Sequence, residues 1–265
     1  MGYNESNLKN DFNAEKVINE FLRKYFYKRF VDNKIIDSFY HITDSNLQHE
    51  GVDTIIITLD GVEICIDEKA ALDYAKRDLG EASLPTFAFE ISYLNRSGIL
   101  TEGWLTNPKY SKTDDYLLIW LWVKPSTKIK YLQCDDILKL EVIVLPKTAI
   151  QNHILYSVSG DKDLDGFRRI ANRQRTFMIY NSLQKVEIED VLSNADLRES
   201  EYAMGNFAFS GTNKFRMKWF LTDITKKAEQ PLNIVVNKNT LIDLAKSYWV
   251  VTPTLCKQEK TKNRS

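Results

Sequence analysis

The clearest pattern of hydrophobic and polar positions lies between residues 51 and 71, GVDTIIITLDGVEICIDEKAA. Two short apolar runs rich in β-branched residues are separated by Asp60-Gly61, a pattern that predicts a β-hairpin. Away from the turn, charged side chains gather at the open end of this hairpin: Asp53, Asp67, Glu68 and Lys69. Because an unpaired ion is costly inside a protein, these acids need a partner, and a divalent metal shared by two of them would supply it.

The length of the turn decides which acids face each other. A loop of residues 60–61 would pair Asp53 with Glu68 and place Asp67 on the other face of the sheet, since side chains alternate. A loop of residues 59–61 with its glycine in the left-handed conformation pairs Asp53 directly with Asp67, with their Cβ atoms about 5 Å apart. We predict this three-residue loop.

A helix is predicted before the hairpin, because apolar residues recur at helical spacing from Asn13 to Phe30. Asn13 is expected to be its N-cap. The polar face of this helix carries four basic side chains: Arg23, Lys24, Lys28 and Arg29. They form either a solvated helix face or a surface that steers phosphates toward a neighbouring site.

Further strands and helices are predicted along the rest of the chain. Residues 35–43 are expected to form a strand that leads into the hairpin. Apolar or alternating runs predict more strands at these positions: 87–93, 114–124, 140–145 and 217–221. Two segments, EVIVLPKTAIQNHI and LNIVVNKNTLIDLA, run from a strand into a helix at Lys147 and Lys238. The basic tail CKQEKTKNRS is expected to be frayed.

Composition indicates a globular protein with a large core, because 43% of the 265 residues are hydrophobic. Basic and acidic residues number 36 each, so only a local basic groove could attract nucleic acid. The three cysteines lie far apart in the sequence, which favours a reducing compartment over a disulfide framework. No apolar run approaches the roughly 20 residues of a membrane helix and no leader is visible. We expect a soluble, cytoplasmic protein without a membrane partner.

The order of helix, strand and a hairpin bearing an acid and Asp-x-Lys resembles the PD-(D/E)XK nuclease superfamily, which has the restriction-endonuclease-like fold. Asp53 in GVD and the triplet Asp67-Glu68-Lys69 in IDEK carry this resemblance, which covers residues 13–124. It implies an α/β (α+β) protein with a central mixed β-sheet flanked by helices. We expect residues 1–125 to form the nuclease-like core and residues 126–265 to add a C-terminal α+β part packed on it, so that the whole chain forms one continuous globular unit.

The resemblance also implies a Mg²⁺-dependent nuclease, with Mn²⁺ as a substitute, that hydrolyses phosphodiester bonds. Asp53 and Asp67 would be metal ligands, since Mg²⁺ takes one or two carboxylates together with water and phosphate oxygens. Lys69 would orient the attacking water and offset charge that develops on the phosphate. DNA is favoured over RNA, because most relatives that the resemblance implies cut DNA.

Three other acids are auxiliary candidates. Glu68 lies inside the motif, Glu20 is a candidate for an upstream helix acid, and Glu90 shares a strand face with small residues. A strand glutamate of this kind is most often on the solvent face. His49, just before the hairpin, could contact substrate, although a lone loop histidine is usually structural.

The densest arginine cluster lies on the basic helix predicted at residues 165–179, and it has four members: Arg168, Arg169, Arg173 and Arg175. The planar guanidinium fork suits phosphate contact, which makes these residues candidates for nucleic-acid binding. The alternative is a helix surface paired with nearby acids such as Asp163 and Asp165.

Three alternatives to a nuclease stay open. Asp53, Asp67 and Lys69 could be a structural ion pair at the edge of the sheet. The protein could be a catalytically inactive module of the nuclease fold that binds nucleic acid or another protein, or a hydrolase of nucleotides. Many nucleases of this kind form homodimers, but no heptad or apolar stripe in the sequence assigns an interface.

Overall fold

A seven-stranded mixed β-sheet dominates the first of two compact units into which the chain divides. The computed structural model describes these residues: 8–43, 47–48, 50–95, 97–160, 163–184, 217–222 and 229–261. Unit 1 comprises three segments: Met1–Pro85, Pro108–Lys147 and Leu241–Ser265. Unit 2 comprises Thr86–Asn107 and Thr148–Thr240. Mixed helix and sheet content confirms the expected α+β class.

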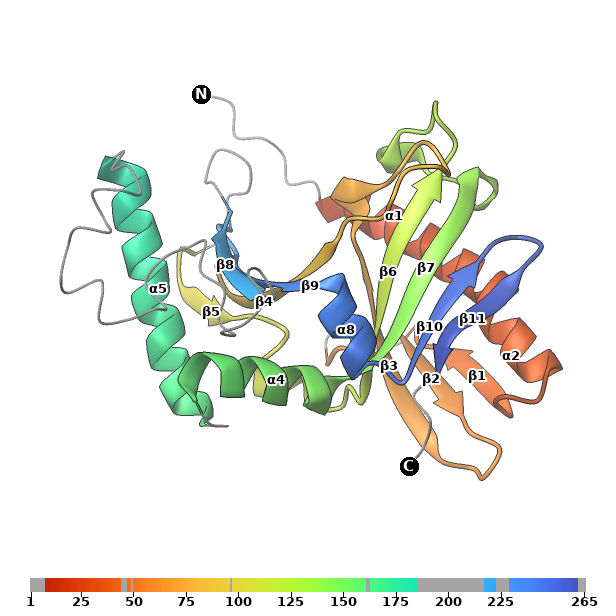
Figure 1. Ribbon diagram of the computed structural model, residues 1–265, viewed down its shortest axis with the longest axis horizontal. Helices are drawn as coiled ribbons and strands as arrows, with labels where there is room; N and C mark the ends of the chain where they lie inside the picture. Colours follow the sequence, from red (N-terminus) through yellow and green to blue (C-terminus); the bar gives the residue numbers. More distant parts are fainter. Residues whose placement is uncertain are drawn as a thin grey trace. The chain divides into compact units, whose positions relative to one another are not determined.

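The strands of the unit 1 sheet run in the order β1-β2-β3-β6-β7-β10-β11 (Figure 1). Their bounds are β1 Ser38–His41, β2 Thr54–Ile57, β3 Glu63–Ala70, β6 Asp115–Val123, β7 Ile137–Pro146, β10 Ser247–Val251 and β11 Cys256–Thr261. Within these strands, β3 and β6 pair in parallel and the other neighbours are antiparallel. Every residue of β6 is buried, as expected for an apolar strand that is covered on both faces.

One continuous helical stretch packs on this sheet and consists of α1 (Leu8–Leu22), the π-helix η1 (Arg23–Tyr27) and α2 (Lys28–Asp32). It begins before Asn13, so the expected N-cap is wrong. Asparagine costs only about 0.7 kcal/mol relative to alanine inside a helix. A residue that favours caps therefore does not force a helix to begin.

The π-helix fits the spacing of one row of buried residues. One row of buried side chains on the helical stretch recurs every fourth residue: Ala14, Ile18, Leu22, Phe26 and Phe30. A strict spacing of four drifts around an α-helix, which has 3.6 residues per turn. The wider i→i+5 turn of a π-helix offsets this drift. It brings Phe26 and Phe30 back toward the sheet.

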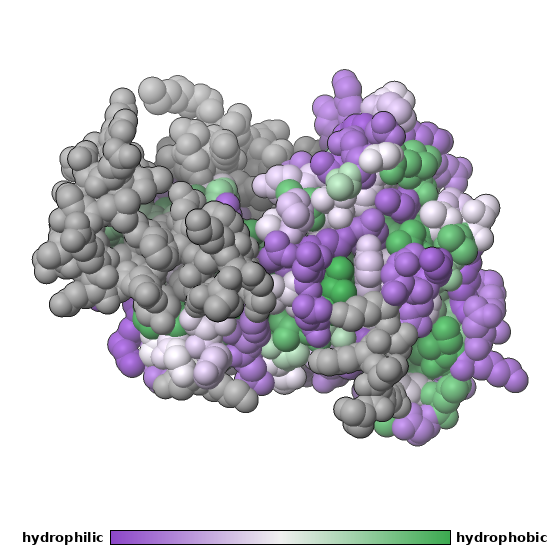
Figure 2. All heavy atoms as spheres, viewed as in Figure 1, coloured by the Kyte–Doolittle hydropathy of each residue, from purple (hydrophilic) through white to green (hydrophobic). Residues whose placement is uncertain are grey.

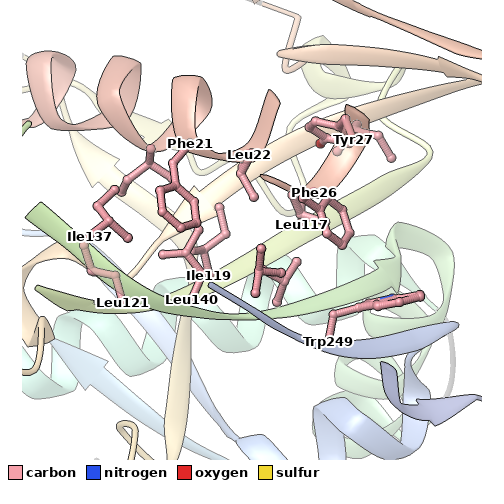
Figure 3. Close-up of a cluster of buried hydrophobic side chains, with 14 of the residues drawn as sticks. Phe21, Leu22, Phe26, Tyr27, Leu117, Ile119, Leu121, Ile137, Leu140 and Trp249 are labelled. Atoms are coloured by element: carbon pink, nitrogen blue, oxygen red, sulfur yellow. The ribbon is translucent and has the colours of Figure 1, made fainter. Parts of the chain in front are cut away.

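The core of unit 1 lies between this helical stretch and one face of the sheet, as Figure 3 shows. Phe21, Leu22 and Phe26 point from the helix toward β6, β7 and β10. The sheet contributes these labelled side chains: Leu117, Ile119, Leu121, Ile137, Leu140 and Trp249. Burial of large apolar side chains of this kind contributes about 1.5–3 kcal/mol each, so this face holds the helix in place.

Unit 2 contains a smaller antiparallel sheet in the order β5-β4-β9-β8. Its strands are β4 Thr86–Leu94, β5 Leu100–Glu102, β8 Met217–Leu221 and β9 Leu232–Asn237. The longer helices α4 (Lys147–Ser159) and α5 (Leu164–Gln184) follow β7 in the chain, and α8 (Lys238–Leu244) follows β9. Phe167 of α5 stacks on Trp219 of β8 with ring centroids 6.1 Å apart. In the described part of unit 1, four short 3-10 helices connect strands: Leu72–Tyr74, Pro108–Tyr110, Ile129–Tyr131 and Cys134–Asp136.

The chain does not divide at residue 125 as expected. The strand β4 lies before that position but belongs to unit 2, whereas β7, β10 and β11 lie after it and complete the sheet of unit 1. The tail is also not frayed throughout, because residues 256–261 form the edge strand β11. Local patterns predict that a strand exists, but not the sheet that it joins.

Polar side chains cover much of the described surface that Figure 2 shows, with hydrophobic residues in smaller separate groups. At the tip of the β2–β3 hairpin, Leu59 and Val62 are exposed. Among the described helices, none is long and apolar enough to cross a membrane.

Candidate functional site

The turn between β2 and β3 has the predicted three-residue loop. The backbone N–H of Thr58 donates to the carbonyl oxygen of Val62 at 2.9 Å, which closes the loop around residues 59–61. Gly61 has a φ of +81°, in the left-handed region that favours glycine. The strand register pairs Thr54 with Ile66, and its continuation by one residue places Asp53 opposite Asp67. The predicted register is confirmed.

The carboxylate of Asp67 is the most enclosed charged group of the hairpin, with only 1% of the residue exposed. Its Oδ1 accepts a hydrogen bond from Lys69 Nζ at 2.5 Å, and its Oδ2 has no hydrogen-bond partner. The Asp53 carboxyl lies within interaction distance of Asp67. Two ionised carboxylates have no donor to offer each other, so this arrangement is open to a proton or a cation.

Electrostatics in the site favour the binding of positive charge. Burial, together with the charge of Asp53, raises the pKa of Asp67 to about 7, although Lys69 acts in the opposite direction. Burial lowers the pKa of Lys69, but the charges of Asp67 and Asp53 outweigh that effect and raise the pKa overall. Lys69 therefore stays protonated, and 29% of its side chain is exposed.

Glu68 makes a second set of contacts, with residues of the first helical stretch and of β2. Its Oε1 accepts hydrogen bonds from Tyr27 Oη and Thr54 Oγ1, both at 2.8 Å. Its Oε2 accepts one from Asn19 Nδ2 at 3.1 Å. Burial, with the charge of Asp53 next in size, raises the pKa of Glu68 to about 7. These donors are neutral, so no described cation pairs directly with this carboxylate.

The backbone of β3 orients Asp53. The N–H of Glu68 donates to Asp53 Oδ2 at 2.8 Å, which holds this carboxyl between Asp67 and Glu68. Asp53 therefore lies close to both Asp67 and Glu68 at the open end of the hairpin, and Lys69 pairs with Asp67. We call Asp53, Asp67, Glu68 and Lys69 the acidic site.

Sequence reasoning missed the residues that support Glu68. Asn19 and Tyr27 lie eight residues apart on the helical stretch, and both are buried. A polar side chain among the buried positions of an amphipathic helix was the available signal. Asn19 Nδ2 also lies 2.9 Å from His41 Nδ1 on β1, so one amide joins β1 to the acidic site.

A glycine closes one side of the acidic site. A Cβ on Gly51 would lie 2.6 Å from Tyr110 Cδ1 and 3.5 Å from Asp67 Oδ2, and φ is +78° there. Thr113 Oγ1 donates to the Gly51 carbonyl oxygen at 2.7 Å. Glycine is therefore required at the start of the Gly-Val-Asp segment by both packing and backbone conformation. The partly exposed Lys69 marks the side on which the acidic site is open.

The other candidate acids occupy different positions. Glu20 is exposed on α1 and is not among the hydrogen-bond partners described for Asp67 and Glu68. Glu90 belongs to β4 in unit 2, where its charge acts on Tyr93 and Arg175. His49 lies outside the described residues.

Two of the four candidate arginines on α5 are engaged within unit 2. Arg168 forms ion pairs with Glu102 at 2.7 Å and Asp165 at 2.8 Å. Arg175 is buried, and its guanidinium donates to Ser92 Oγ at 3.2 Å and to the Gln230 carbonyl oxygen at 2.6 Å. The prediction that Arg175 contacts phosphate is therefore wrong for this structure.

The remaining two arginines are on the surface of α5. Arg169 lies 3.6 Å from Asp163, and Arg173 is exposed. The four arginines therefore do not form one basic surface.

Within the described residues, no group of three or more histidine, cysteine, aspartate or glutamate side chains is arranged to hold a metal ion. The acidic site offers the two carboxylates of Asp53 and Asp67 on adjoining strands. Two carboxylates are the usual protein contribution to a Mg²⁺ site that is completed by water and phosphate oxygens.

Comparisons with family models, with characterised proteins and with solved structures found no match for the chain. The likeness to the PD-(D/E)XK nuclease superfamily therefore stays a prediction from the order of helix, strand and hairpin.

Proposed function

We propose that this protein is a Mg²⁺-dependent nuclease that hydrolyses phosphodiester bonds of DNA at the acidic site. The observation that carries the proposal is the buried Asp67 carboxylate, whose Oδ2 has no hydrogen-bond partner and which faces a second carboxylate from the adjoining strand. The order of helix, strand and acid-bearing hairpin supports the same class. DNA is favoured over RNA on the resemblance alone.

The residues of the acidic site fit a hard divalent cation. The two carboxylates of Asp53 and Asp67 stand against the single charge of Lys69, and an excess of buried negative charge needs compensation. Asp53 and Asp67 would hold the ion through oxygen atoms, the ligands that Mg²⁺ and Mn²⁺ prefer. When bound, the metal would polarise the scissile phosphate and lower the pKa of a coordinated water.

The protein's own residues have separate roles in this proposal. Lys69, which stays protonated and partly exposed, would turn from Asp67 toward the phosphate and offset the charge that develops there. Its release becomes favourable once another cation balances Asp67. The backbone N–H of Glu68 would keep Asp53 oriented, because that hydrogen bond is already formed at 2.8 Å.

Cleavage and metal binding test the proposal together. Supercoiled plasmid and single-stranded DNA are incubated with Mg²⁺ or Mn²⁺, and Mn²⁺ binding is measured by calorimetry. Asp67→Asn is expected to lose both metal binding and cleavage, and Lys69→Met to lose cleavage while it keeps the fold. Glu63→Gln, which removes an exposed acid from the same strand, is the matched control and should behave as the native protein.

A catalytically inactive module of the same fold is the second candidate. The observation that favours it is the ion pair of Lys69 with Asp67 at 2.5 Å, together with the close packing of Gly51 against the Asp67 carboxylate. Absence of cleavage under every condition, with Mn²⁺ binding unchanged in Asp67→Asn, would refute the nuclease and leave this candidate.

A further inference from the structure

A groove with a volume of about 850 Å³ runs along the first helical stretch beside β1, within unit 1. Four basic side chains line it: Lys16, Arg23, Lys24 and Lys28. The acidic side chains that line it are Glu20 and Asp32, and Lys28 already pairs with Asp32 at 3.2 Å. The groove therefore carries an excess of positive charge on a protein whose total charge is balanced.

The lining of the groove includes residues that contact the acidic site. Asn19 lines the groove and donates to Glu68 Oε2 at 3.1 Å. His41 also lines the groove, and its Nδ1 lies 2.9 Å from Nδ2 of the same Asn19 amide. In the sheet, His41 pairs with Thr54, the residue after Asp53. Asn19 thus separates the groove from the Glu68 carboxylate.

The local structure of the helix explains why cations reach the groove. The π-helix keeps Phe26 and Tyr27 buried while it leaves Arg23 and Lys24 exposed at its first two positions. Lys24 Nζ lies 4.9 Å from the centre of the Tyr25 ring. π-turns of this kind are often found at functional sites.

An aromatic side chain adds a second type of contact. Phe39 of β1 lines the groove, is partly exposed, and stacks on Tyr27 with centroids 5.3 Å apart. Cationic grooves with aromatic side chains are typical of proteins that bind single-stranded nucleic acid, where phosphates meet the cations and bases stack on the rings.

We propose that this groove binds one strand of DNA beside Glu68 of the acidic site. The inference rests on the proposed function for the identity of the strand. The volume of the groove, about 850 Å³, falls in the range of about 300–1,000 Å³ that is typical of sites for molecules of a few rings, so it can hold a short segment of one strand.

Binding is measured without cleavage, so that the groove and the nuclease are tested separately. The full-length protein is titrated in EDTA against a short fluorescent oligothymidylate, and the anisotropy is followed at several salt concentrations. The double variant Arg23→Ala/Lys24→Ala is expected to bind at least about tenfold more weakly. The slope of log K against log salt should become shallower by about 1.4, since single strands contribute about 0.7 per phosphate contact.

Two further variants control for charge and for folding. Arg169→Ala/Arg173→Ala removes the same two charges from the exposed surface of α5 and is expected to bind as the native protein does. Glu20→Gln removes an acid from the groove and is expected to tighten binding, a gain that loss of folding cannot produce. Asp67→Asn should keep its affinity in EDTA.

The outcomes separate the two proposals. Three results would overturn the proposal that the groove binds a single strand of DNA. They are native-like binding by Arg23→Ala/Lys24→Ala, an equal loss of affinity in Arg169→Ala/Arg173→Ala, and tighter binding of duplex DNA or RNA than of single-stranded DNA. Unchanged affinity in Glu20→Gln would also count against it. If strand binding depends on the groove but no metal-dependent cleavage is seen, the proposal for the groove is supported and only the proposed nuclease activity is overturned.

Discussion

Replacing Glu68 by glutamine is expected to flatten the dependence of stability on pH. In the folded protein, burial and the charge of Asp53 raise the pKa of Glu68 from 4.5 to about 7. Between these two values the folded state keeps a proton that the unfolded state has released. The free energy of unfolding therefore falls as the pH rises through this window, because stability follows the difference in bound protons.

The magnitude follows from the two pKa values. A rise from 4.5 to about 7 in the pKa of Glu68 corresponds to about 3 kcal/mol when the proton is bound fully in the folded state only. Partial exposure of Glu68 and partial protonation of the unfolded chain reduce this to about 2 kcal/mol between about pH 5 and about pH 8. Over the same pH range, the free energy of unfolding of Glu68→Gln should therefore fall by about 2 kcal/mol less than that of the native protein.

The two stability profiles are expected to cross. Glutamine has one acceptor oxygen, so one of the donors Asn19, Tyr27 and Thr54 loses its partner, at a cost of about 1 kcal/mol. The variant should therefore be less stable than the native protein near pH 5 and more stable near pH 8.

Urea denaturation in EDTA, followed by tryptophan fluorescence across this pH range, measures the effect. Glu63→Gln is the matched control, because this exposed residue lies on the same strand. Parallel pH profiles of the free energy of unfolding for the native protein and Glu68→Gln would refute the prediction, because they would show that the pKa of Glu68 is not raised in the folded protein.

Three further outcomes are expected. Gly61→Ala should lower the free energy of unfolding by about 1 kcal/mol, since a Cβ there meets nothing within 4 Å and only the positive φ is unfavourable; denaturation measures it, and no loss would contradict the turn. Gly51→Ala should cost more, because its Cβ would lie 2.6 Å from Tyr110 Cδ1, and an equal effect in the two variants would count against this packing. Arg175→Ala should cost about 2 kcal/mol through its lost buried hydrogen bonds, whereas Arg173→Ala should leave the thermal midpoint unchanged.

The sequence was sufficient to predict the hairpin and its register. Turn type, strand alternation and the position of Gly61 are local properties, and each depends on residues that are close in the chain. The same holds for the strands that lead into α4 and α8, where Lys147 and Lys238 stand at the first helical position.

Properties that depend on distant pairing could not be predicted. The local pattern predicts β4 as an alternating strand and β6 as a continuous apolar strand, but it does not show that the two belong to different sheets. Arg175 has the local appearance of a surface arginine, and its burial depends on Ser92 and Gln230, both far away in the sequence. The partners of Glu68 come from a helix and a strand that precede it.

The length of the loop at residues 59–61 has a consequence for the evolution of this chain. Its side chains lie far from the acids, and Leu59 is 63% exposed, so substitutions at the tip should be tolerated. Insertion or deletion of a single residue is different, because a register shift of one moves every side chain of the strand to the opposite face. Homologous chains that keep the pairing of Asp53 with Asp67 should therefore vary in the residue types of this loop but conserve its length.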